Sequence, residues 1–161
     1  MKNIVLLISI VMFVSACTKE VPETGKKLTK EIGEKEINEI FDQFTSNFND
    51  GRLDSAFSFY SQDFTAYGPH FDSTVNLEKF TDDIKSYRMQ NADKKLIIKI
   101  EDISLSEELA AVQSLDSFYA FDPVENKMVP VFSEKSIWLL KKNKSGNWKI
   151  FKVLSAQIES Y

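Results

Sequence analysis

Residues 37–60 read INEIFDQFTSNFNDGRLDSAFSFY, and this stretch decides how the chain begins to fold. The sequence Asn49-Asp50-Gly51 predicts the end of a helix, because glycine tolerates the left-handed conformation found at helix ends. Before it, apolar residues recur at spacings of three and four, which places on one helical stripe Ile37, Ile40, Phe41, Phe44 and Phe48. After it, a shorter stripe runs from Leu53 to Tyr60. The pattern predicts two helices whose phenylalanine-rich faces pack against a sheet.

After residue 60, the sequence predicts one further helix and a series of strands. A helix is expected at 77–90 with Asn76 as its cap, after a brief strand at 64–67. Apolar residues that alternate with polar ones predict longer strands near 96–100, 110–119, 129–140 and 148–155. Helices gathered at one end and strands at the other indicate an α+β fold. Such a sheet curves around the helices and leaves a concave pocket.

Composition narrows the function classes. The chain has 161 residues and ordinary globular proportions, which is typical of one domain. A net charge of −4 gives no electrostatic footprint for nucleic acid. One histidine, one cysteine and no glycine-rich phosphate loop give no support for a metal site, a nucleotide or another cofactor. Thirteen phenylalanines suggest a core or cavity walled by rings.

The N-terminus carries an export signal. Lys2 precedes an apolar run at 4–14 that is shorter than the ~20 residues a membrane-spanning helix needs. The following run, Val14-Ser15-Ala16-Cys17, resembles the lipobox of bacterial lipoproteins. That resemblance implies a signal peptide at 1–16 and a lipid-modified Cys17 that holds the protein on the bilayer. The alternative is a conventional secretory signal with its cysteine near the cut by chance.

The lipoprotein resemblance also implies a location. In that family the cysteine sulfur carries diacylglycerol and the new amine is usually acylated, with palmitate as the expected chain. Several acyl chains hold a protein almost irreversibly on a membrane. Thr18, rather than aspartate, follows the cysteine, which favours the outer membrane over the inner one by enterobacterial sorting rules. Residues 17–30 are expected to form a flexible tether, and residues 31–161 the folded domain.

Short motifs in the domain resemble the nuclear transport factor 2-like superfamily, which includes polyketide-cyclase-like (SnoaL-like) and ketosteroid-isomerase-like proteins. The motifs are GRLD at 51–54, FY at 59–60, DF at 63–64 and GNWKI at 146–150. The resemblance covers roughly residues 31–158 and implies a cone-shaped α+β barrel. Members include isomerases, dehydratases, cyclases and non-catalytic binding modules, so the fold alone does not assign a function.

Two residues are candidates for proton transfer. His70 lies in a loop two residues before Asp72 and is either an oriented general base or an exposed histidine without a partner. Asp116 shares its strand face with Val112, Ser114 and Phe118. If that face points into the pocket, burial raises the pKa of Asp116; if it points outward, Asp116 is a solvated carboxylate.

Aromatic side chains with polar tips are candidates for lining the pocket or simply for filling the core: Tyr60, Tyr67, Tyr119 and Trp138. Two functions remain open. The first is a tethered, non-catalytic module that binds a small apolar ligand or a protein partner, and whose sheet also offers a surface for a homodimer. The second is a lyase or isomerase that acts on a small hydrophobic substrate. Ionisable groups clustered inside the pocket favour the enzyme, and an all-apolar pocket favours the binding module.

Overall fold

A computed structural model describes residues 23–160 of the chain, which form three helices and six strands. The elements, in chain order, are α1 (Glu23–Asn49), α2 (Leu53–Phe57), β1 (Tyr60–Tyr67), β2 (Val75–Asn76), α3 (Leu77–Gln90), β3 (Lys95–Leu105), β4 (Leu109–Asp122), β5 (Lys127–Lys142) and β6 (Trp148–Ser160). The α+β class predicted from the sequence is confirmed.

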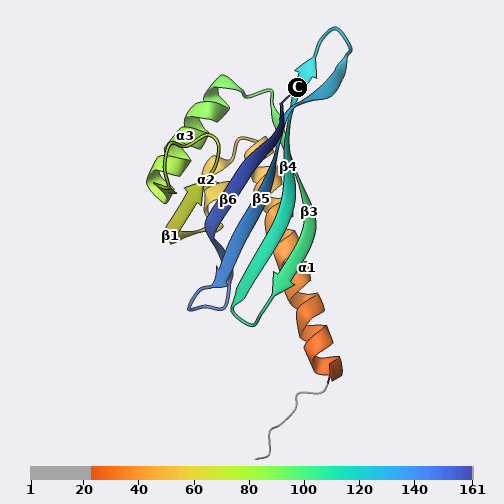
Figure 1. Cartoon of the computed structure of the whole chain (residues 1–161), viewed down its shortest axis with the longest axis vertical. Helices are drawn as coiled ribbons and strands as arrows, with labels where there is room; N and C mark the ends of the chain where they lie inside the picture. Colours follow the sequence, from red (N-terminus) through yellow and green to blue (C-terminus); the bar gives the residue numbers. More distant parts are fainter. Residues whose placement is uncertain (1–22, 161) are drawn as a thin grey trace, which may run out of the picture.

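One curved sheet organises the molecule (Figure 1). Its strand order is β2-β1-β6-β5-β4-β3, and every neighbouring pair is antiparallel except β1 with β6. Helix α1 packs against β3 and α2, and α3 packs against β1 and β2. The helices therefore cover one face of the sheet, and β6 separates β1 from β5.

The predicted stripe of α1 forms the centre of the core. Ile37, Phe41, Phe44 and Phe48 are each at most 3% exposed, and they pack with residues of the sheet's inner face. The helix ends as the sequence predicts, with Gly51 in the left-handed region at φ 74°. Helix α3 occupies the expected residues, and the Asn76 side chain accepts a hydrogen bond from the Lys79 amide at 3.0 Å.

Helix α1 begins at Glu23, earlier than the expected start near residue 31. Residues 23–30 are therefore helical, where the sequence predicted a tether. Extending an existing helix costs far less than nucleating one, and lysine and glutamate favour helix, so no apolar periodicity was needed. Within residues 23–160 no helix has both the length and the apolar character to cross a membrane. The signal sequence and Cys17 lie outside the described residues.

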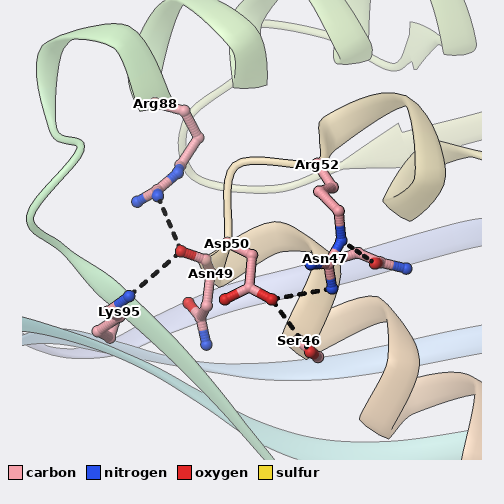
Figure 2. A network of polar contacts seen from close by, with 7 residues as sticks. All are labelled: Ser46, Asn47, Asn49, Asp50, Arg52, Arg88 and Lys95. Carbon is pink, nitrogen blue, oxygen red and sulfur yellow. Dashed lines mark hydrogen bonds and ion pairs between the residues drawn. The ribbon is translucent and has the colours of Figure 1, made fainter.

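A buried arginine joins the ends of the two long helices (Figure 2). The guanidinium of Arg88, on α3, donates to the carbonyl oxygens of Lys94 at 2.7 Å and Asn49 at 3.4 Å. The Asn49 side chain in turn pairs with both backbone groups of Leu96 at 2.8 Å. These contacts tie the end of α1, the end of α3 and the start of β3 together, which fixes α3 over the sheet.

Candidate functional site

A cavity of about 420 Å³ lies between the helices and the concave face of the sheet. Helices α1 and α2 supply Phe44, Phe48 and Phe57 to its wall, and α3 supplies Phe80, Ile84 and Tyr87. The structure thus holds a largely aromatic pocket in the position where the sequence predicts one.

Small residues form one row across the sheet, and two of them, Ser136 and Ser155, line the cavity. Ser114, Ser136 and Ser155 lie side by side on β4, β5 and β6. Gly68, just after β1, approaches Ser155 closely enough to continue the row. On the same face of β5, two large residues flank Ser136: Trp138 lies two positions after it and Phe132 four positions before it. The small side chains of Ser136 and Ser155 leave room between these bulkier neighbours on the sheet side of the cavity.

Two carboxyl groups face each other in the next row. Asp116 on β4 is directly opposite Glu134 on β5, and both side chains are buried. Burial raises the pKa of Asp116 to about 6, and the negative charge of Glu134 adds to the rise. Hydroxyl groups of Ser136 and Ser114 oppose it; Ser114 Oγ donates to Asp116 Oδ1 at 2.7 Å. Trp138 Nε1 donates to Ser114 Oγ at 2.9 Å, which holds this donor in place.

His70 has a partner. Its Nε2 lies 2.5 Å from Glu134 Oε1, and its ring meets Phe132 edge-on at 5.4 Å. The histidine side chain is 52% exposed, whereas that of Glu134 is only 10% exposed. The interpretation of His70 as a loop residue without a partner is wrong, and the carboxylate that meets it is Glu134 rather than the nearby Asp72. The dyad connects the buried carboxyl row to solvent.

On the cavity wall, the buried hydroxyl group of Tyr60 lacks a hydrogen-bond partner among the described residues, whereas that of Ser136 interacts with the carboxyl group of Asp116. Burial raises the pKa of Tyr60, and the nearby charge of Asp116 adds to the rise, so the phenol keeps its proton. Leaving such a group unsatisfied costs free energy, which a ligand oxygen would recover.

The other sequence candidates divide between the cavity and its outside. Tyr67 and Trp138 line the cavity, but Tyr119 does not. Tyr119 lies an odd number of residues from Asp116, so the alternation of the strand turns it away from the concave face. A bulge also follows Phe118.

Sequence reasoning missed Glu134 and Ser136. The signal was present in β5, where Phe132, Glu134, Ser136 and Trp138 alternate on one face. In the described part of the chain, no three His, Cys, Asp or Glu side chains gather in a way that could hold a metal ion.

Comparison with known proteins identifies the architecture. No protein-family model and no curated protein match the sequence. Among solved structures, an NTF2-like protein with a cystatin-like fold from Novosphingobium aromaticivorans superposes with a TM-score of 0.72 at 11% identity, covering 89% of this chain and 94% of that one. The chain has the nuclear transport factor 2-like fold.

Two further structures with this fold are similar. A ketosteroid isomerase-like protein from Erwinia carotovora atroseptica has a TM-score of 0.60 at 16% identity, covering 76% of this chain and 94% of that one. An NTF-2 like protein of unknown function from Shewanella oneidensis has a TM-score of 0.61 at 17% identity, covering 77% and 98%. The nuclear transport factor 2-like architecture predicted from the sequence is confirmed, and identities this low carry no function.

Proposed function

We propose that the cavity binds a small, largely apolar molecule that carries an oxygen able to accept hydrogen bonds. The observation that carries this proposal is the unpartnered hydroxyl group of Tyr60, which lies on the cavity wall near the carboxyl group of Asp116. Below pH 6 the protonated Asp116 becomes a further donor. Donors on the wall of an aromatic pocket favour an acceptor oxygen over a second apolar group.

The size of the cavity supports a ligand of one or two rings. Its volume of about 420 Å³ falls at the lower end of the range found for small-molecule sites, about 300–1,000 Å³. Edge-on ring contacts shape its wall, for example Phe44 with Trp138 at 5.9 Å and Tyr60 with Phe80 at 5.5 Å. Flat aromatic molecules complement such a wall, because ring pairs prefer edge-on and offset contacts.

The test compares two probes that differ by one oxygen, 2-naphthol and naphthalene, through the indole N–H signal of Trp138 in NMR spectra. We expect both to shift this signal and 2-naphthol to bind more tightly. Tyr60→Phe should weaken 2-naphthol binding about tenfold, the value of one hydrogen bond to a buried donor, and leave naphthalene unaffected. Tyr119→Phe is the matched control outside the cavity. Equal affinities for the two probes would contradict the proposal.

The His70–Glu134 dyad favours a second candidate function, a lyase or isomerase. It places a proton acceptor at 2.5 Å from a buried carboxylate, opposite Asp116, whose raised pKa suits a proton donor. A histidine–carboxylate pair and a second carboxyl group of raised pKa in one cavity are an arrangement suited to acid–base catalysis. A bicyclic ketone with acidic α-hydrogens, 2-tetralone, tests this in deuterated water. If the protein is a catalyst, the α-hydrogens of 2-tetralone should exchange faster with the protein than in buffer, and Glu134→Gln should abolish this acceleration. Exchange at the buffer rate would leave only binding.

We also propose that the protein is an envelope lipoprotein anchored through Cys17, with the outer membrane as its site. The support is the sequence at 14–17 and the short apolar run before it. When cells are grown with a radioactive fatty acid such as palmitate, the wild-type protein should become labelled. Cys17→Ser should give an unlabelled, unprocessed precursor. A wild-type protein without lipid would end this proposal and leave the secretory alternative.

A further inference from the structure

Gly68 stands where the chain leaves β1 and turns toward the cavity. It follows Tyr67, the last residue of β1, and is buried. A turn begins there, because the Phe71 amide donates to the Gly68 carbonyl oxygen at 3.1 Å. The loop formed by residues 68–71 carries His70 and ends at Phe71, which lines the cavity.

The partner of His70 is two strands away. Glu134 lies on β5, and the sheet order places β6 between β1 and β5. Neighbouring strands are about 4.8 Å apart, so the distance to be crossed is about 10 Å. An imidazole side chain alone is shorter than this. The Glu134 side chain spans part of this distance, and the loop supplies the rest by leaning toward β6, where Gly68 lies against Ser155, so that His70 Nε2 comes to 2.5 Å from Glu134 Oε1.

The absence of a side chain at Gly68 permits this close approach. A Cβ atom at this position would lie 2.4 Å from Ser155 Oγ, and 3.6 Å from Ser155 Cβ and from the Ser155 carbonyl oxygen, on β6. Backbone conformation is not the reason for glycine here, since among the described glycines only Gly51 and Gly146 have positive φ. The requirement at Gly68 is for space.

We propose that Gly68 is a positioning residue: its bare backbone lies against Ser155, so that the loop leans toward β6 and delivers His70 to Glu134. This inference rests on the proposed function of the cavity, because it assigns a role in completing the cavity's polar end. The same contact explains why the serine row continues into a glycine rather than a fourth side chain.

His70 is the only histidine in the chain, so its ring signals in NMR spectra report this contact without ambiguity. Glu134→Ala, which removes the partner oxygen, provides the signature of a broken dyad. We expect Gly68→Val to move the His70 ring C–H signals away from their wild-type positions, with loss of the ring-current shift from Phe132. Gly68→Ala should have a smaller effect, because the Ser155 hydroxyl can rotate away from a single methyl group.

A rescue experiment separates positioning from general damage. Adding Ser155→Gly to Gly68→Ala removes the crowding atom and should restore the wild-type His70 signals. Gly33→Ala is the matched control: its Cβ would also lie 2.4 Å from a side-chain atom, Leu105 Cδ2, but neither residue lines the cavity. It should leave His70 unchanged. If Gly68→Val does not fold, the Gly68→Ala variant and its rescue decide the question.

Each result has a distinct meaning. Unchanged His70 signals in folded Gly68→Val, or equal changes in Gly33→Ala, would overturn the positioning role. Displaced signals with rescue support it. The same samples are then tested with 2-tetralone. Displaced His70 signals with wild-type exchange would keep the positioning role and contradict the catalytic candidate, so the two failures are distinguishable.

Discussion

Phe41→Ala is expected to lower the free energy of unfolding by about 3–5 kcal/mol. The Phe41 side chain is 2% exposed and meets Trp138 edge-on at 5.3 Å. Its loss removes buried apolar surface and leaves a cavity that the long paired strands β4, β5 and β6 cannot collapse to fill. Urea denaturation of the purified variant and wild-type proteins measures the difference.

The matched control is Ile32→Ala on the same helix. Ile32 is 53% exposed, and its replacement should change stability by less than about 0.5 kcal/mol. A loss below about 1 kcal/mol at Phe41 would show that this face of α1 does not pack on the sheet.

Asp116→Asn is expected to stabilise the protein at pH 8 by about 3 kcal/mol, at about 1.4 kcal/mol per pKa unit. Folding raises the pKa of Asp116 from 3.8 to about 6, chiefly through burial. The neutral form therefore favours the folded state below pH 4, and this stabilisation is lost as the pH rises through 6. Asparagine imitates the neutral form at every pH and can still accept the hydrogen bond from Ser114.

The pH dependence of unfolding separates this effect from ordinary repacking. The gain from Asp116→Asn should be large at pH 8, shrink between pH 6 and pH 4, and vanish below pH 4. Stability that the substitution lowers equally at pH 4 and pH 8 would contradict a buried, penalised carboxylate. A site residue that costs stability when it is ionised is typical of functional rather than structural positions.

Local patterns were enough to predict much of the fold. Helix α3 and its Asn76 cap follow from sequence alone, because capping and periodicity act within a few residues. The two-residue strand β2 could not be predicted, since it forms only through pairing with Thr65 and Ala66 of β1. The early start of α1 at Glu23 was also missed, because its added residues carry no apolar stripe.

Only part of the candidate site could be predicted from the sequence, because some of its contacts join residues that are far apart in the chain. Asp116 could be found because alternation along β4 assigns its face, and the structure buries it there. The His70–Glu134 contact joins residues 64 positions apart and depends on a loop that leans toward the strand between them. Nothing near His70 in the sequence indicates that approach, and the reason for Gly68 appears only when Ser155 is seen against it.

The proposed site depends on Asp116 being a buried carboxyl group on the cavity wall with a raised pKa. The most direct test of this is an NMR titration of the Asp116 side-chain carboxyl carbon in the wild-type protein. The account predicts a midpoint near pH 6, because burial and the neighbouring Glu134 disfavour the charged form. A midpoint close to 3.8 would show that Asp116 is solvated, and would contradict the account of the cavity as a site built around it.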